Sequence, residues 1–177
     1  RSACLLVVED DPVQRRTLSG FLRKAGHDVI EASSAAQALE VSTGREIDLL
    51  ITDLRLGGPD GIELLRDLRK VHTDVQALVL TAYGTVEDAV RAMRAGAYDF
   101  VAKPIDLERV EALIEKAYME EIRIAEAAAK KEADPAKRVE LETRLFSLRE
   151  QFNRDLIELD QDRADARKKL DEQEVER

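Results

Sequence analysis

Three carboxylates, a hydroxyl and an amine stand directly after short apolar runs in the first part of this chain of 177 residues. Clustered carboxylates repel one another and raise one another's pKa unless a cation lies among them. Oxygen ligands of this kind suit Mg²⁺, which also accepts backbone carbonyls. We therefore predict a magnesium site whose ligands come from Glu9, Asp10, Asp53 and the backbone carbonyl of Arg55.

The same residues are a sufficient set for phosphoryl transfer. That reaction needs positioning and charge neutralisation, which a carboxylate nucleophile, a divalent ion, a lysine and a hydroxyl supply. Asp53 is the central acid, and we predict that it accepts the phosphoryl group beside Lys103 and Thr81. Each of these residues alone could instead cap a helix or close a turn. Their joint placement after apolar runs favours a site.

The apolar runs predict the elements that would position these side chains. Short, continuous, β-branched runs are typical of strands buried on both faces. They occupy residues 4–8, 28–30, 48–51, 77–80 and 100–102 and alternate with amphipathic stretches. This order predicts a doubly wound α/β fold with a five-stranded parallel sheet. Ligands of such sheets bind beyond the carboxyl ends of the strands, where the candidate residues stand.

Three of the intervening stretches have apolar residues at helical spacing, and we expect these faces to pack on the sheet. Glycines after the first and third stretches, Gly26 and Gly96, are typical of helix C-termini. The three faces are Leu18, Phe21 and Leu22; Ile62, Leu65 and Leu68; and Val86, Ala89, Val90 and Met93.

After residue 105 the chain consists of uninterrupted helix formers. We predict one helix from an N-cap at Asp106 to about Ala133, and another after Asp134-Pro135, where Pro suits the first helical position. The break leaves a kink and a hairpin both open. The domains expected are 1–118 and a helical extension, 119–177. Coiled-coil spacing in the extension links Leu141, Leu145, Leu148 and Phe152. This apolar stripe favours self-association of the extension or its packing on the first helix.

Composition limits the classes of partner. The net charge is −9 and 37% of residues are charged. No basic patch of the kind that neutralises nucleic-acid phosphates is apparent, so we expect no direct nucleic-acid binding. The chain has one cysteine, Cys4, and no apolar segment long enough to span a membrane, which favours a reducing cytoplasm. His27 and His72 are interpreted as surface residues.

Four motifs at matched spacing closely resemble response-regulator receiver domains over about residues 3–118. They are Val7-Val8-Glu9-Asp10-Asp11-Pro12, Thr52-Asp53, Leu80-Thr81-Ala82 and Ala102-Lys103-Pro104. The stretches 81–85 and 96–104 are most similar to the nitrogen-regulator (NtrC-like) group. The resemblance implies a flavodoxin-like receiver fold and a cis peptide at Lys103-Pro104.

The resemblance also implies a role for each site residue. Glu9 and Asp10 would be the acidic pair that holds Mg²⁺, and Asp11 is the alternative member of that pair. Asp53 would accept phosphate from a histidine kinase or phosphotransfer protein. Lys103 would pair with the phosphoryl group. Thr81 would move towards that group, and Phe100 would fill the space that Thr81 leaves.

The departures from the family bear on output. Gly57 stands where the family often has Pro, and no phosphate-binding loop or other effector motif follows residue 118. We expect a non-enzymatic switch that controls protein–protein interaction or homodimerisation through its face and helical tail. One alternative is a transcription factor whose effector domain lies outside this chain. A less favoured one is an aspartyl-phosphate phosphatase, whose second acid would stand where Arg55 does.

Overall fold

The computed structural model describes residues 3–150. The chain divides into two compact units: Ala3–Ala117, and the part from Tyr118 onward. The first unit contains the whole sheet and every candidate site residue.

The first unit is built on a five-stranded sheet in which every neighbouring pair of strands is parallel. The strands run in the order β2-β1-β3-β4-β5. Their bounds are Cys4–Val8 (β1), Asp28–Ala32 (β2), Leu49–Asp53 (β3), Gln76–Thr81 (β4) and Asp99–Ala102 (β5). The predicted fold is confirmed. The order reverses between β1 and β3, the position where ligands bind in such sheets.

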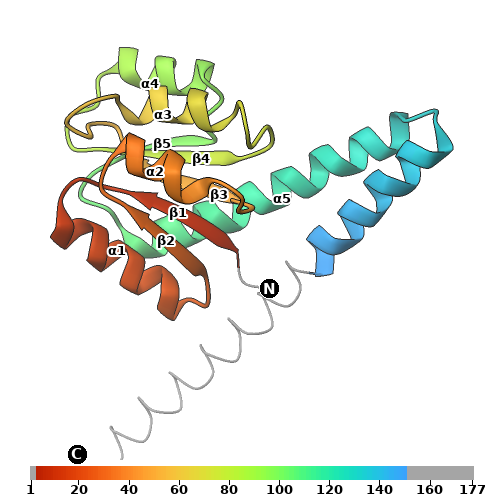
Figure 1. The fold of residues 1–177 in the computed structure, drawn as a ribbon, viewed down its shortest axis with the longest axis horizontal. Helices are drawn as coiled ribbons and strands as arrows, with labels where there is room; N and C mark the ends of the chain where they lie inside the picture. The colour runs from red at the N-terminus through yellow and green to blue at the C-terminus, as the bar shows by residue number, and fades with distance from the viewer. Residues whose placement is uncertain (1–2, 151–177) are drawn as a thin grey trace, which may run out of the picture. The chain divides into compact units, whose positions relative to one another are not determined.

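Helices cover both faces of this sheet. Figure 1 shows α1 and the start of α5 on one face, and α2, α3 and α4 on the other. Their bounds are Pro12–Lys24 (α1), Ala35–Ser42 (α2), Gly61–Leu68 (α3), Val86–Arg94 (α4) and Leu107–Lys131 (α5). All five residues of β3 are buried, which explains why its sequence is a continuous apolar run up to Thr52-Asp53.

The helices begin where a side chain can accept the free N–H groups of the first turn. Asp11 caps α1, and Asp60 and Thr85 form capping boxes with Glu63 and Asp88. Gly61, the first residue of α3, sits so close to β3 that an added Cβ would meet the Asp53 carbonyl oxygen. The start of α3 is thereby held against the backbone of Asp53.

The predicted apolar face of α4 is not buried, and this expectation was wrong. Val86, Val90 and Met93 are 83%, 42% and 51% exposed, and Ala92 is the one fully buried residue of the helix. A small side chain lets the helix approach the sheet closely, so α4 is rotated with its alanines inward. The larger apolar side chains form an outward surface.

The second unit contains the end of α5 and a further helix that begins at residue 135. Asp134 accepts the Ala136 N–H at 2.9 Å, as predicted for an N-cap followed by Pro135. Figure 1 shows this helix folding back beside the end of α5, so the break forms a hairpin. Ion pairs Arg144–Glu121 and Arg149–Glu126 join the two helices. The predicted coiled-coil position Phe152 lies outside the described residues.

The interpretation of both histidines as surface residues was wrong for His27 and only partly right for His72, which is half-buried. The His27 side chain is 8% exposed, and its Nε2 lies 3.1 Å from Oε1 of Glu111 on α5. Nε2 of His72 is buried. His27 is covered by α5, which lies far from it in sequence, so the local pattern does not reveal its burial. Within residues 3–150 no helix is long and apolar enough to cross a membrane.

Candidate functional site

The carboxyl ends of β1, β3, β4 and β5 surround one cavity of about 420 Å³. Asp53 and Thr81 are the last residues of β3 and β4, while Glu9 and Lys103 directly follow β1 and β5. Parallel strands bring these residues together because their carboxyl ends share one edge. The predicted residues that line the cavity are Glu9, Asp10, Asp53, Arg55, Thr81 and Lys103.

The ammonium group of Lys103 is the centre of the site. It donates to Oδ2 of Asp53 at 2.5 Å, to Oε2 of Glu9 at 2.6 Å and to Oε1 of Gln14 at 2.8 Å. An ammonium has three N–H donors, and these acceptors use all of them. Lys103 must therefore release one of these acceptors before it can donate to a phosphoryl oxygen.

Burial strengthens these charge interactions. The side chains of Glu9, Lys103 and Asp53 are 5%, 10% and 11% exposed. Burial raises the pKa of Glu9 above its ordinary value, and the hydrogen bond from Lys103 only partly opposes that rise. Burial lowers the pKa of Lys103, but hydrogen bonds to Asp53 and Glu9 outweigh it, so the pKa is raised overall. The lysine is thus held in its charged form.

Three carboxylates are close enough to share a cation. Glu9, Asp10 and Asp53 each offer an oxygen, and these oxygens lie within 4.8 Å of one another. Such a group of oxygen donors with one exposed member, Asp10, fits Mg²⁺, which retains several waters. Oδ1 of Asp53 accepts the Arg55 N–H at 3.0 Å, so the backbone after β3 orients the carboxylate. The Arg55 carbonyl remains a predicted ligand.

Asp11 has a different task from its two acidic neighbours. Its Oδ1 accepts the N–H groups of Val13 and Gln14 at 2.8 and 2.9 Å, which caps α1. These hydrogen bonds lower the pKa of Asp11. Its carboxylate is therefore committed to the helix, and it lies outside the cluster formed by Glu9, Asp10 and Asp53.

Thr81 and Phe100 lie together beside the turn after β4. The Thr81 side chain is buried, and its Oγ1 accepts the Tyr83 N–H at 3.2 Å. Phe100 is half-buried against the core. Gly84 precedes the N-cap of α4, and a Cβ at that position would meet the Thr81 methyl group and the Phe100 ring. The Lys103-Pro104 peptide is cis, as the resemblance implied.

Two residues of the site were missed in the sequence. Gln14 holds Lys103, and Nη1 of Arg15 donates to the Glu9 carbonyl at 2.7 Å. Both lie on the first turns of α1, which starts at the same sheet edge as the acids. Their position just after the N-cap Asp11 was the available signal, because that turn must face the carboxyl end of β1.

A family model described as "Response regulator receiver domain" matches residues 5–115. The transcriptional regulatory protein ZraR of Escherichia coli O157:H7 is 39% identical over 113 residues, which are 64% of this chain and 26% of ZraR. FixJ of Bradyrhizobium diazoefficiens, also a transcriptional regulatory protein, is 38% identical over 129 residues, covering 73% of this chain and 61% of FixJ. The chain thus spans about a quarter of the length of relatives such as ZraR.

Solved structures share this fold. NtrX from Brucella abortus superposes with a TM-score of 0.68 at 32% identity, over 74% of this chain and 30% of NtrX. The beryllofluoride-activated NtrC4 receiver domain dimer gives 0.63 at 27% identity, over 67% of this chain and 98% of that domain. Both names agree with the nitrogen-regulator group that the sequence resembles.

Proposed function

The chain belongs to the response regulator receiver family of two-component systems, and on this premise we propose that Asp53 is its phosphoryl acceptor. The observation that carries the proposal is the pairing of Asp53 with Lys103 at the switch point of the sheet, beside two further carboxylates. The phosphoryl donor is the phosphohistidine of a cognate histidine kinase or phosphotransfer protein. Since that donor is a separate protein, transfer occurs in trans.

In the transfer step an oxygen of Asp53 forms a bond to phosphorus while the bond from phosphorus to the donor histidine nitrogen breaks. Glu9, Asp10, Asp53 and the Arg55 carbonyl would hold Mg²⁺, which would neutralise charge on the phosphoryl oxygens. Lys103 exchanges one of its present acceptors for a phosphoryl oxygen. Gln14 is neutral, so it keeps the ammonium over Asp53 without adding charge that competes with the phosphate.

Switching follows from the position of Thr81. In the proposed switch Thr81 moves towards the phosphoryl group to donate to one of its oxygens, and this movement breaks the hydrogen bond from the Tyr83 N–H. Phe100 then turns into the space released beside Gly84. The turn after β4 leads directly into α4, so a movement of the turn shifts the position of the outward apolar surface of α4. We assign that surface to binding a partner or a second copy, and the similar fold of a beryllofluoride-activated receiver domain dimer, that of NtrC4, supports the second possibility.

The proposed activity is a switch rather than enzymatic turnover of free substrates. Arg55 stands where an aspartyl-phosphate phosphatase would need its second acid, which disfavours that alternative. A second candidate, a receiver whose effector domain lies outside this chain, is favoured by the names and the greater length of relatives such as ZraR. In that case the helices after Tyr118 would link the receiver to its effector.

Labelling with acetyl phosphate tests the central proposal. The full chain should gain one phosphoryl group per molecule in Mg²⁺, and Asp53→Asn should gain none. Asp67→Asn is the matched control, because Asp67 is an exposed aspartate of α3 that pairs with Lys70. Equal labelling of wild type and Asp53→Asn would overturn the assignment of Asp53.

A further inference from the structure

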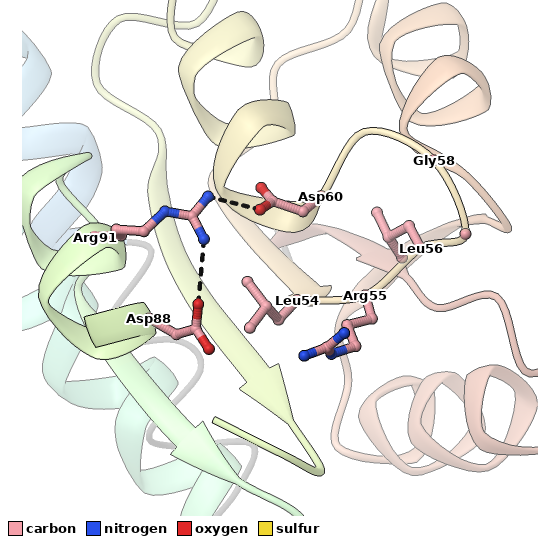
Figure 2. Close-up of a pocket in the computed structure, with 8 residues that line it drawn as sticks. Leu54, Arg55, Leu56, Gly58, Asp60, Asp88 and Arg91 are labelled. Atoms are coloured by element: carbon pink, nitrogen blue, oxygen red, sulfur yellow. Dashed lines mark hydrogen bonds and ion pairs between the residues drawn. The ribbon is translucent and has the colours of Figure 1, made fainter. Parts of the chain in front are cut away.

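A second cavity, of about 410 Å³, lies between the loop after β3 and helix α4. Figure 2 shows Arg91 extending from α4 to Asp60 on the opposite wall, with Asp88 below it on its own helix. Nη2 of Arg91 lies 2.8 Å from Oδ2 of Asp60, and Nη1 lies 3.2 Å from Oδ1 of Asp88. One guanidinium thus joins the two walls.

Both carboxylates that Arg91 holds are also helix caps. Oδ1 of Asp60 accepts the N–H groups of Ile62 and Glu63 at 2.9 and 2.8 Å, at the start of α3. Oδ2 of Asp88 accepts the N–H of Thr85 at 3.2 Å, at the start of α4. Each carboxylate uses one oxygen for its cap and the other for Arg91. Arg91 therefore ties the beginning of α3 to the beginning of α4.

Two segments run from the proposed phosphorylation site to these helix starts: the loop after Asp53 leads to α3, and the turn after Thr81 leads to α4. On one side, Leu54 follows Asp53 and its carbonyl accepts the Gly61 N–H at 2.9 Å, where α3 begins. On the other side, Thr81 leads through the turn at Tyr83 to α4. A change at Asp53 that moves Thr81 would alter the distance that Arg91 spans.

Helix α4 has little else to hold it in place. Ala92 is its one fully buried residue, whereas α3 buries five of its eight residues. A helix with so little buried apolar area moves at low cost, so a single charged tie weighs heavily in its position. The Arg91, Asp60 and Asp88 side chains are 42%, 24% and 16% exposed, which limits the strength of the tie.

We propose that Arg91 is a latch that favours the ground conformation, in which Thr81 Oγ1 accepts the Tyr83 N–H and Lys103 holds Asp53. The proposal rests on the proposed function, because it describes regulation of the same site. A tie that exists in one conformation and is lost in the other shifts the equilibrium between them by its own free energy. Linkage is reciprocal, so removing the latch must tighten binding of whatever favours the switched conformation.

The test is calorimetric titration of the full chain with beryllofluoride in saturating Mg²⁺. Arg91→Gln removes the charge, while Asp60→Asn keeps the α3 cap and removes only its ion pair, since Asn caps as well as Asp. Both should bind beryllofluoride about two- to fivefold more tightly, the range that exposed ion pairs reach. The double variant should gain nothing further, because both substitutions remove the same tie.

Arg94→Gln is the matched control, since Arg94 lies on the last turn of α4 and makes no ion pair within residues 3–150. It should bind beryllofluoride as wild type does. Arg91→Lys should give an intermediate affinity, because an ammonium can pair with one carboxylate but does not form the two-ended bridge. A merely structural role would not tighten binding, since loss of stability does not favour the bound state.

The outcomes separate the latch from the function. Unchanged or weaker beryllofluoride binding in Arg91→Gln and Asp60→Asn, with wild-type binding intact, would overturn the latch and leave the proposed function standing. Absence of beryllofluoride binding in the wild type would overturn the proposed function itself. Tighter binding in Arg94→Gln by the same factor would also overturn the latch, because it would show a general effect of α4 charge.

Discussion

The Nζ atom of Lys103 lies 2.5 Å from Oδ2 of Asp53, although 50 residues separate them in the chain. This contact joins the residue after β5 to the last residue of β3, across the end of β4 that lies between them. The register of the sheet sets the distance, since Asp53 pairs with Leu80 and Thr81 with Ala102. The pair therefore depends on correct assembly of three parallel strands.

Replacing Lys103 with Met distinguishes the effect of this lysine on phosphoryl transfer from its effect on Mg²⁺ binding by the carboxylates. Acetyl-phosphate labelling of Asp53 should fall by at least about tenfold, because a charge-assisted hydrogen bond to the phosphoryl group is lost. Affinity for Mg²⁺ should rise, since the ammonium that competes for Glu9 and Asp53 is gone. Labelling measured at saturating Mg²⁺, with metal titrated separately, distinguishes these effects. Weaker Mg²⁺ binding in Lys103→Met would contradict this electrostatic account.

Gln14→Met should slow labelling by about two- to tenfold, the range of a single hydrogen bond, because Lys103 loses the neutral acceptor that keeps its ammonium over Asp53. Gln14→Glu should slow it further, since a carboxylate at that place competes with the phosphoryl oxygens for Lys103. Val13→Ala, an exposed neighbour on the same turn, serves as the control. Equal rates for wild type, Gln14→Met and Gln14→Glu would remove Gln14 from the site.

The raised pKa of Glu9 predicts a pH dependence of stability in the absence of Mg²⁺. A carboxyl whose folded pKa lies above its unfolded pKa binds more protons in the folded state, so stability falls as pH rises through that window. The window begins near the ordinary value of 4.5 and extends upward. The free energy of unfolding of the wild type, measured by urea denaturation, should therefore fall as pH rises from about 4 to 7, the range that spans this window. Glu9→Gln should flatten this dependence; the same slope in both proteins would refute the prediction.

Gly61→Ala should destabilise the fold by about 1–3 kcal/mol, because the added methyl group would overlap the Asp53 carbonyl oxygen and the Thr52 side chain. Gly20→Ala is the matched control inside α1, where nothing lies within 4 Å of the new Cβ. It should stabilise the protein by about 0.5–1 kcal/mol through helix propensity. Urea denaturation compares the two free energies of unfolding. A neutral Gly61→Ala would mean that α3 can move away from Asp53 at little cost.

The sequence alone determined the strands, their parallel arrangement and the residues at their carboxyl ends. This was possible because those signals are local: an apolar run marks each buried strand, and Glu9, Asp53 and Thr81 follow or end such runs. The start of the second tail helix at residue 135 was likewise local, since it depends on the Asp134 cap and Pro135.

Only the tertiary structure decided which way α4 turns its apolar side chains, which partners cover His27, and which acceptors take the hydrogen bonds of Lys103. The rotation of α4 depends on how closely Ala92 approaches the sheet, and the pairing of His27 depends on where α5 passes. The Gln14 contact and the Arg91 bridge likewise join segments far apart in sequence. Periodicity describes a helix relative to itself, whereas these contacts depend on its placement relative to other elements.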